Sequence, residues 1–222
     1  MRSKVLIFGH RGAAEYEDEN TLASFEKAIE LKADGVELDV RLTKDRKVAV
    51  IHDAKVNRTT DKKGYVEDYT LEELGRMGVP SLQNVFDLMK GTGITILIEI
   101  KDEGMENVLV KLIRENEMEN QVVIISFIIE SIIKIKKMIN IRTGYSQAKP
   151  LSNLSKLLDG AIEAKADFIL PRYGLVTKSF VEHARINGLK IITWTVNYKL
   201  IAKSLISRGV YGIITNKPDL LD

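Results

Sequence analysis

The fold is decided near the N-terminus, where Val5-Leu-Ile-Phe-Gly9 is followed by an amphipathic segment over Asn20–Ala33 and then by Gly35-Val-Glu-Leu-Asp-Val40. The first and third stretches are short and mainly apolar, which is typical of buried strands, and the apolar residues between them recur at helical spacing. Strands that are apolar on both sides indicate a parallel sheet whose faces are covered by helices. The order strand, helix, strand therefore predicts an α/β fold.

The same pattern repeats along the rest of the chain. Further strand candidates are Val48–His52, Thr95–Ile100, Val122–Phe127, Arg142–Tyr145, Asp167–Leu170, Lys190–Val196 and Tyr211–Thr215. Further helix candidates are Met105–Glu115, Glu130–Ile139, Leu154–Ala166, Val176–Asn187, Tyr198–Arg208 and a short helix opened by the capping box Thr70-Leu-Glu-Glu73. Repeated units of this kind in 222 residues predict a (β/α)8 TIM barrel, with a doubly wound open sheet as the alternative.

One feature of the strand count does not fit a simple barrel. The nine strand candidates are one more than a barrel of this type needs, so one of them is misassigned or lies outside the ring. The link from Val40 to Val48 is also too short for a crossover helix, so one helix is missing if the second and third ring strands flank this link. No linker rich in Pro, Gly or Ser divides the chain, so we expect a single catalytic domain over residues 1–222.

Composition excludes several classes of function. The chain has 33 Lys and Arg against 31 Asp and Glu, a net charge of +2, which argues against a nucleic-acid partner. It has no Cys, which excludes disulfides, thiolate nucleophiles and Cys-based zinc sites. The apolar run after Lys4 is too short for a signal peptide, and no apolar stretch is long enough for a membrane span. We therefore expect a cytoplasmic protein without membrane insertion, and its oligomeric state is left open.

Acidic residues are placed at the ends of two predicted strands. Glu37 and Asp39 lie two residues apart, as do Glu99 and Lys101, so each pair projects from one face of its strand. Carboxylates that converge in an apolar barrel repel one another unless a cation neutralises them, and oxygen ligands suit hard divalent ions. The sequence therefore predicts a site for one Mg²⁺ or Ca²⁺, with Mn²⁺ as a further option, in which Lys101 and Arg11 offset the remaining negative charge.

Two of the three histidines also follow predicted strands. His10 and His52 end different strands, so one can remove a proton while the other donates one to a leaving group. Arg11 offers a fork of donors suited to phosphate oxygens, and these residues together favour a phosphodiester substrate. Asp53 either orients His52 or closes the turn after it, and His183 lies in a helix without such neighbours.

The sequence resembles the glycerophosphodiester phosphodiesterases, a family of phospholipase C-like phosphodiesterase barrels. The matching stretches extend over essentially the whole chain: Gly-His-Arg-Gly (9–12), Glu-Asn-Thr (19–21), Gly-Val-Glu-Leu-Asp-Val (35–40), Thr-Lys-Asp (43–45), Ile-His-Asp (51–53), Ile-Glu-Ile-Lys (98–101), Ser-Phe (126–127), Trp-Thr-Val-Asn (194–197) and Gly-Ile-Ile-Thr-Asn (212–216). The family's usual proline before Glu-Asn-Thr is Asp18 here.

The resemblance implies a role for each matching position. It makes Glu37, Asp39 and Glu99 the metal ligands and His10 and His52 the catalytic pair, with Arg11 and Lys101 at the phosphate. Phe127 and Trp194 would line the substrate pocket, although a single aromatic at a strand end such as Trp194 serves equally well in a core.

The activity that the resemblance implies is metal-dependent hydrolysis of glycerophosphodiesters, small-molecule substrates, to glycerol 3-phosphate and an alcohol. The two histidines would act as acid and base, with a cyclic phosphate between two steps. The alternatives are a related phosphodiesterase acting on lysophospholipids and a non-catalytic barrel that binds phosphate metabolites. Both histidines favour an enzyme, because a binding protein needs no acid–base pair.

Overall fold

A computed structural model describes residues 5–148 and 154–222 of the chain. The strands are β1 (Leu6–His10), β2 (Gly35–Leu42), β3 (Val48–Val50), β4 (Thr95–Ile100), β5 (Val122–Ser126), β6 (Arg142–Gln147), β7 (Phe168–Pro171), β8 (Lys190–Thr193) and β9 (Gly212–Thr215). The α-helices are α1 (Leu22–Glu30), α2 (Leu71–Arg76), α3 (Leu82–Met89), α4 (Glu106–Glu115), α5 (Ile129–Met138), α6 (Leu154–Glu163), α7 (Lys178–Ile186) and α8 (Lys199–Arg208). Short 3₁₀ helices are η1 (Val56–Arg58), η2 (Val66–Asp68) and η3 (Tyr173–Leu175).

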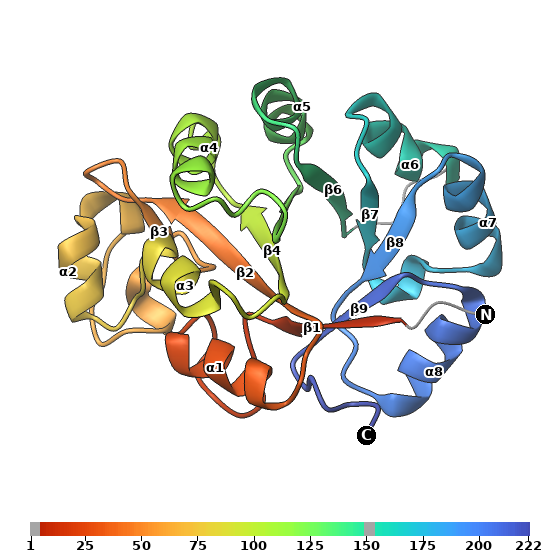
Figure 1. Cartoon of the computed structure of the whole chain (residues 1–222), viewed down its shortest axis with the longest axis horizontal. Coiled ribbons are helices and arrows are strands. Elements are labelled where there is room, and N and C mark those ends of the chain that lie inside the picture. Colours follow the sequence, from red (N-terminus) through yellow and green to blue (C-terminus); the bar gives the residue numbers. More distant parts are fainter. Residues whose placement is uncertain (1–4, 149–153) are drawn as a thin grey trace.

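Eight of the strands form a closed parallel ring. The order is β1, β2, β4, β5, β6, β7, β8 and β9, and β9 pairs with β1 to close the sheet. Helices surround the ring, and β1 lies next to β9 although they are at opposite ends of the sequence (Figure 1). The TIM barrel prediction is confirmed, and the alternative of an open doubly wound sheet is wrong.

The ninth strand, β3, lies outside the ring. It pairs antiparallel with β2 through the tight turn at Thr43–Lys47, where the Thr43 amide donates to the Lys47 carbonyl over 3.0 Å. The expectation that one of the nine strand candidates lies outside the ring is confirmed, and the short link from β2 to β3 carries no helix, as its length predicted. An antiparallel hairpin needs no crossover, and the third ring strand is β4.

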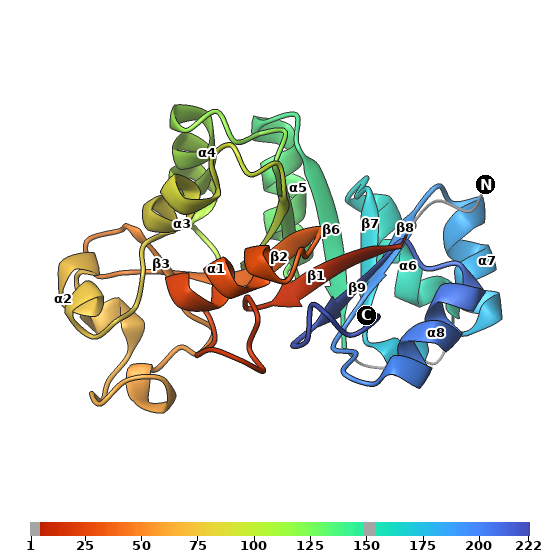
Figure 2. The ribbon, with the colours of Figure 1, turned by 60° about the horizontal axis from the view of Figure 1, so that its bottom comes forward.

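The chain between β2 and β4 does carry a covering helix, α3, which was not predicted. Its signal is present in the sequence, because Leu82, Val85, Phe86 and Met89 follow helical spacing and are buried. Ser81 caps its N-terminus by accepting from the Asn84 amide. The part of this connection from residue 48 to residue 79, which contains β3 and α2, is called the outer segment below. Figures 1 and 2 show α2 at the end of the molecule opposite α7 and α8.

The interior of the ring is built in two layers. The lower layer is apolar and consists of Phe8, Leu97, Val123, Ile125, Phe168, Leu170, Ile192 and Ile214. Side chains repeat every two residues on one face of a strand, so residues two positions further along point into the same interior near the C-terminal ends of the strands. These second positions include His10, Glu99, Phe127, Trp194 and Asn216. The fold thus places these side chains above the apolar lower layer, at the C-terminal ends of the strands.

The outer faces of the strands pack against the helices. Along β2, for example, Val36, Leu38 and Val40 are fully buried in a cluster shared with the surrounding helices. The outer segment has a separate small core that includes Ile51, Val56, Val66, Leu74 and Val79. Among residues 5–148 and 154–222, no helix is long and apolar enough to cross a membrane.

Candidate active site

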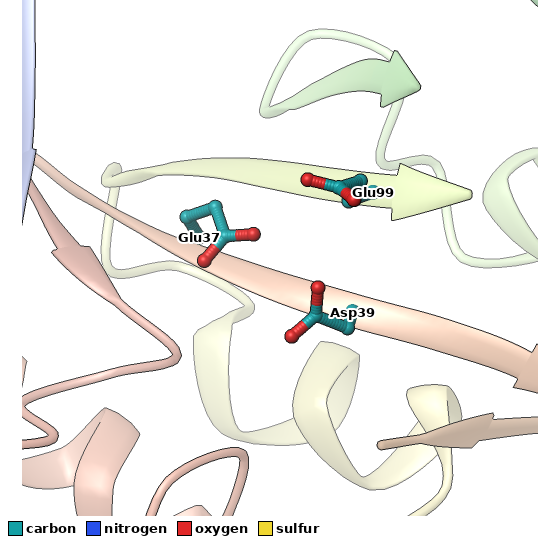
Figure 3. A group of neighbouring side chains, drawn as sticks. All are labelled: Glu37, Asp39 and Glu99. Carbon is teal, nitrogen blue, oxygen red and sulfur yellow. The ribbon is translucent and has the colours of Figure 1, made fainter. Parts of the chain in front are cut away.

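Three acidic side chains meet at the C-terminal ends of β2 and β4. Glu37, Asp39 and Glu99 are all buried, and one carboxylate oxygen of each lies within 4.8 Å of those of the other two. The parallel register places Asp39 beside Glu99, and Figure 3 shows the carboxylates projecting into the space between them. Because buried like charges repel, this group is suited to holding a divalent cation through oxygen ligands.

Two basic side chains lie against the acidic group. Lys101 donates to Glu99 and contacts Asp39 with its Nζ 2.8 Å from Oδ1, and the Arg11 Nε lies 3.3 Å from Asp39 Oδ2. Burial and the neighbouring carboxylates raise the pKa of Glu37 well above its ordinary value. Burial also opposes ionisation of Asp39, yet Lys101 and Arg11 lower its pKa. The site therefore keeps Asp39 ionised and penalises charge on Glu37.

The loop between β1 and α1 reaches back to the acidic group. Asn20 is buried, and its side-chain Nδ2 donates to Asp39 Oδ2 over 2.9 Å. Its main-chain N–H donates to the Arg11 carbonyl. Arg11 and Asn20 both adopt positive φ angles of 53° and 57°, a region that asparagine tolerates better than most residues. Asn20 thus orients a carboxylate of the acidic group, a role that the sequence alone did not reveal.

His10 ends β1 inside the ring. Its Nδ1 donates to the Asn216 side-chain oxygen over 2.7 Å, and its Nε2 lies 4.0 Å from Glu37 Oε2. Burial lowers the pKa of His10 to about 4, so the ring is neutral at neutral pH. Asn216 was not predicted as a site residue, but its position two residues after Ile214 on β9 carries the signal.

His52 reaches the same site from outside the ring. It follows β3, its Nδ1 donates to Asp53 Oδ1 over 2.7 Å, and its carbonyl accepts from Arg41 Nε over 2.8 Å. The pKa of His52 is lowered, mainly by burial, and the carboxylates of Asp39 and Asp53 offset part of this effect by favouring the protonated form. Of the two interpretations of Asp53, the structure supports the one in which it orients the imidazole.

All the side chains predicted for the site line one cavity of about 150 Å³. Phe127 and Trp194 stand on its apolar side with their rings edge to face and their centroids 5.6 Å apart. The Trp194 indole donates to the Leu170 carbonyl over 2.8 Å, which fixes its orientation. The structure thus puts Trp194 in the pocket wall, where the sequence left core and pocket equally open.

Comparisons with known proteins find relatives over nearly the whole chain. The profile of the glycerophosphoryl diester phosphodiesterase family matches residues 10–220. A glycerophosphodiester phosphodiesterase of Caldanaerobacter subterraneus subsp. tengcongensis is 37% identical, over 98% of this chain and 96% of that protein. The solved structure of a glycerophosphodiester phosphodiesterase from Thermotoga maritima superposes with a TM-score of 0.86 at 28% identity, covering 99% of this chain and 98% of that one.

A phosphodiesterase from Oleispira antarctica, solved in complex with the product sn-glycerol-3-phosphate, has the same fold, with a TM-score of 0.87 at 22% identity. That alignment covers 96% of this chain and 94% of the other.

Proposed function

The chain belongs to the glycerophosphoryl diester phosphodiesterase family, and from this premise we propose that it hydrolyses glycerophosphodiesters with a divalent cation and two histidines of unequal roles. The observation that carries this proposal is the single cavity that brings together the acidic group, both histidines and two basic side chains. A cavity that only binds a phosphate would need cationic groups, but it would need no pair of histidines acting as acid and base.

The residues present fit a hard divalent cation. Glu37, Asp39 and Glu99 supply only oxygen ligands, and the high pKa of Glu37 reflects charge that a cation would neutralise. When bound there, Mg²⁺ or Ca²⁺ would supply Lewis-acid polarisation of a phosphate oxygen. Arg11 and Lys101 lie beside the same carboxylates and would bind the other phosphate oxygens.

His10 is suited to be the general base of the first step. Its Nδ1–H is committed to a neutral amide oxygen of Asn216, so the lone pair of a neutral imidazole lies at Nε2. The low pKa, about 4, keeps this nitrogen unprotonated at neutral pH. His10 would take the proton from the glycerol hydroxyl next to the phosphate, and that oxygen would attack phosphorus.

His52 is suited to be the general acid. Its Nδ1 faces the carboxylate of Asp53, a partner that stabilises an imidazolium better than an amide does. His52 would donate its Nε2 proton to the departing alcohol oxygen, leaving a cyclic phosphate. Water would then open the ring with the roles of the two histidines reversed, giving glycerol 3-phosphate.

The cavity size supports a small glycerophosphoryl group as the portion of the substrate that is enclosed. A volume of about 150 Å³ with one apolar wall of Phe127 and Trp194 suits a glycerol unit packed against aromatic rings. The related phosphodiesterase whose structure holds sn-glycerol-3-phosphate supports the same product here.

The proposal is tested by assaying glycerophosphocholine, glycerophosphoethanolamine and a lysophospholipid with Mg²⁺, Ca²⁺ or Mn²⁺ and after thorough chelation. We expect hydrolysis of the first two that is lost on chelation and restored by a metal. Hydrolysis that survives chelation would remove the metal from the proposal, and activity on the lysophospholipid alone would change the substrate class. His10→Ala and His52→Ala are expected to lower kcat by about 10² to 10⁴ while the protein stays folded.

A further inference from the structure

Arg58 lies at the centre of a chain of charged side chains that ends at His52. Its Nε donates to Asp53 Oδ2 over 2.7 Å, and its Nη2 donates to Asp53 Oδ1 over 3.2 Å. On the other side its Nη1 and Nη2 donate to both oxygens of Glu19, over 2.8 and 2.7 Å. Glu19 also accepts from Arg11 over 2.7 Å. A guanidinium is the group that can hold two carboxylates in fixed planes at once.

These contacts connect two segments that lie far apart in the sequence. Arg58 and Asp53 belong to the outer segment, whereas Glu19 lies in the loop after β1, 39 positions from Arg58 in sequence. The contacts at the His52 end of the outer segment include the Asp53 hydrogen bond, the Arg41 contact to the His52 carbonyl and the main-chain bond from Ile51 to Asp39. The imidazole itself is oriented through Asp53, and Asp53 is held by Arg58.

Without His52, the positive charges of Arg11 and Arg58 equal the negative charges of Glu19 and Asp53. Arg11 and Arg58 face Glu19 and Asp53, so each carboxylate has a guanidinium partner. Removal of Arg58 would leave Asp53 free to rotate away from the imidazole and would leave Glu19 with Arg11 alone. The first consequence concerns the geometry of proton donation, because an acid must lie within hydrogen-bond reach of the leaving oxygen.

We propose that Arg58 is a positioning residue for the general acid, acting through Asp53 to hold His52 in line with the leaving alcohol. The proposal rests on the function proposed above, in which His52 protonates the departing oxygen. It assigns to Arg58 an effect on one proton transfer and no contact with the substrate phosphate.

The test compares two substrates that share the glycerophosphoryl half and differ in the leaving group. Glycerophosphoethanolamine releases an alkyl alcohol that needs a proton, whereas the p-nitrophenyl ester of glycerol 3-phosphate releases a stable phenolate that needs none. Release of the leaving group is measured in a single turnover with excess enzyme, which isolates the first step. For Arg58→Met we expect a fall of about 10- to 100-fold with the alkyl substrate and less than about 3-fold with the nitrophenyl ester, while the enzyme concentration that gives half the maximal rate changes little.

Two further variants check that the effect passes through His52. In a His52→Ala background, Arg58→Met is expected to cost almost nothing more, because residues that act as one unit are not additive. Arg58→Lys keeps the charge but loses the two-sided fork, so we expect partial recovery of the alkyl rate. If Arg58→Met does not fold, the same substrate ratio is measured with Arg58→Lys, where a smaller selective loss is expected.

A matched control lies on the same segment. Arg76 forms an exposed ion pair with Glu72 on α2, and Arg76→Met is expected to leave both rates unchanged. Equal losses on the two substrates, or full activity of Arg58→Met, would overturn the positioning role while leaving the hydrolase intact. Absence of turnover by the wild-type protein on both substrates would instead contradict the proposed function.

Discussion

The ring and the outer segment contribute to the same site but fix their side chains by different means. In the ring, Asp39 lies on β2, whose main chain is fixed by parallel pairing with β1 and β4, and Asn20 then orients its carboxylate. In the outer segment, His52 follows a three-residue antiparallel strand and is held by the side chains of Asp53 and Arg41. The comparison shows that the acidic group lies on the barrel's own strands, whereas His52 depends on polar side chains outside the ring.

The largest effect is expected from a change inside the ring. Glu37→Gln should lower the hydrolysis rate about 10³-fold or more, because it replaces a charged ligand of the proposed cation with a neutral amide, and such a cation would contribute several kcal/mol to catalysis. The fold should persist, since the amide oxygen still accepts from the Arg11 main-chain N–H over the 3.1 Å contact. Activity is measured under metal saturation, and folding by circular dichroism.

The same variant, Glu37→Gln, is expected to raise the stability of the protein although it lowers its activity. Burial with Asp39 and Glu99 raises the pKa of Glu37, so the stability associated with this group is full below its unfolded pKa and is lost as pH rises through the folded value. In chelator, Glu37→Gln should therefore melt a few degrees above the wild type at pH 8, and the gap should close at about pH 4. A variant that is less stable at pH 8 would contradict the repulsion argument.

An intermediate effect is expected from the core of the outer segment. Leu74 is fully buried there, and Leu74→Ala should cost about 2 to 4 kcal/mol. Because this core is separate from that of the ring, the substitution should favour local opening of residues 48–79, which is seen as faster amide exchange there. Activity should also fall, because His52 lies in this segment. Ile98→Ala, an equally buried change on β4, is the control and should instead weaken the ring. Uniform exchange changes in both variants would break the distinction between the two regions.

The smallest effect is expected at the turn that begins the outer segment. Asp45 accepts from the Thr43 hydroxyl over 2.6 Å and from the Leu71 amide over 2.9 Å, and the Thr43 contact is the main cause that lowers its pKa to about 2. The stability it gives is present above about pH 4 and is lost as pH falls toward 2. Asp45→Asn should cost about 0.5 kcal/mol at pH 7 and nothing near pH 2, measured by melting temperature. Glu67→Gln, an exposed change on the nearby η2, is the control for loss of one surface charge and should leave the melting temperature at pH 7 unchanged.

Prediction from sequence succeeded where a residue's role depends on its place in one strand. The period-two spacing of Glu37 and Asp39 was sufficient to put both carboxylates inside the barrel, and parallel strands bring Glu99 beside them. The sequence left the direction of β3 open, because the chain after a tight turn can pair back on β2 or continue around the ring with the same apolar residues. The missed helix α3 is different, since its apolar spacing and its Ser81 cap were both readable.

The contacts that orient the side chains of the site could not be predicted from the sequence, for a physical reason. Asn216 meets His10 across 206 positions, and Glu19 meets Arg58 across 39, so each pair forms only when the ring closes and the outer segment docks. Short polar side chains carry no local pattern that identifies a distant partner.

The sequence by itself determined the repeated strand–helix units and the acidic and histidine side chains at strand ends, because these depend on spacing and burial within single elements. Only the tertiary structure decided that β3 leaves the ring, that His52 enters the site from outside it, and that Asn216 and Asp53 give the two histidines different partners. Those outcomes depend on long-range pairing, whose free energy is shared among segments that the local sequence describes one at a time.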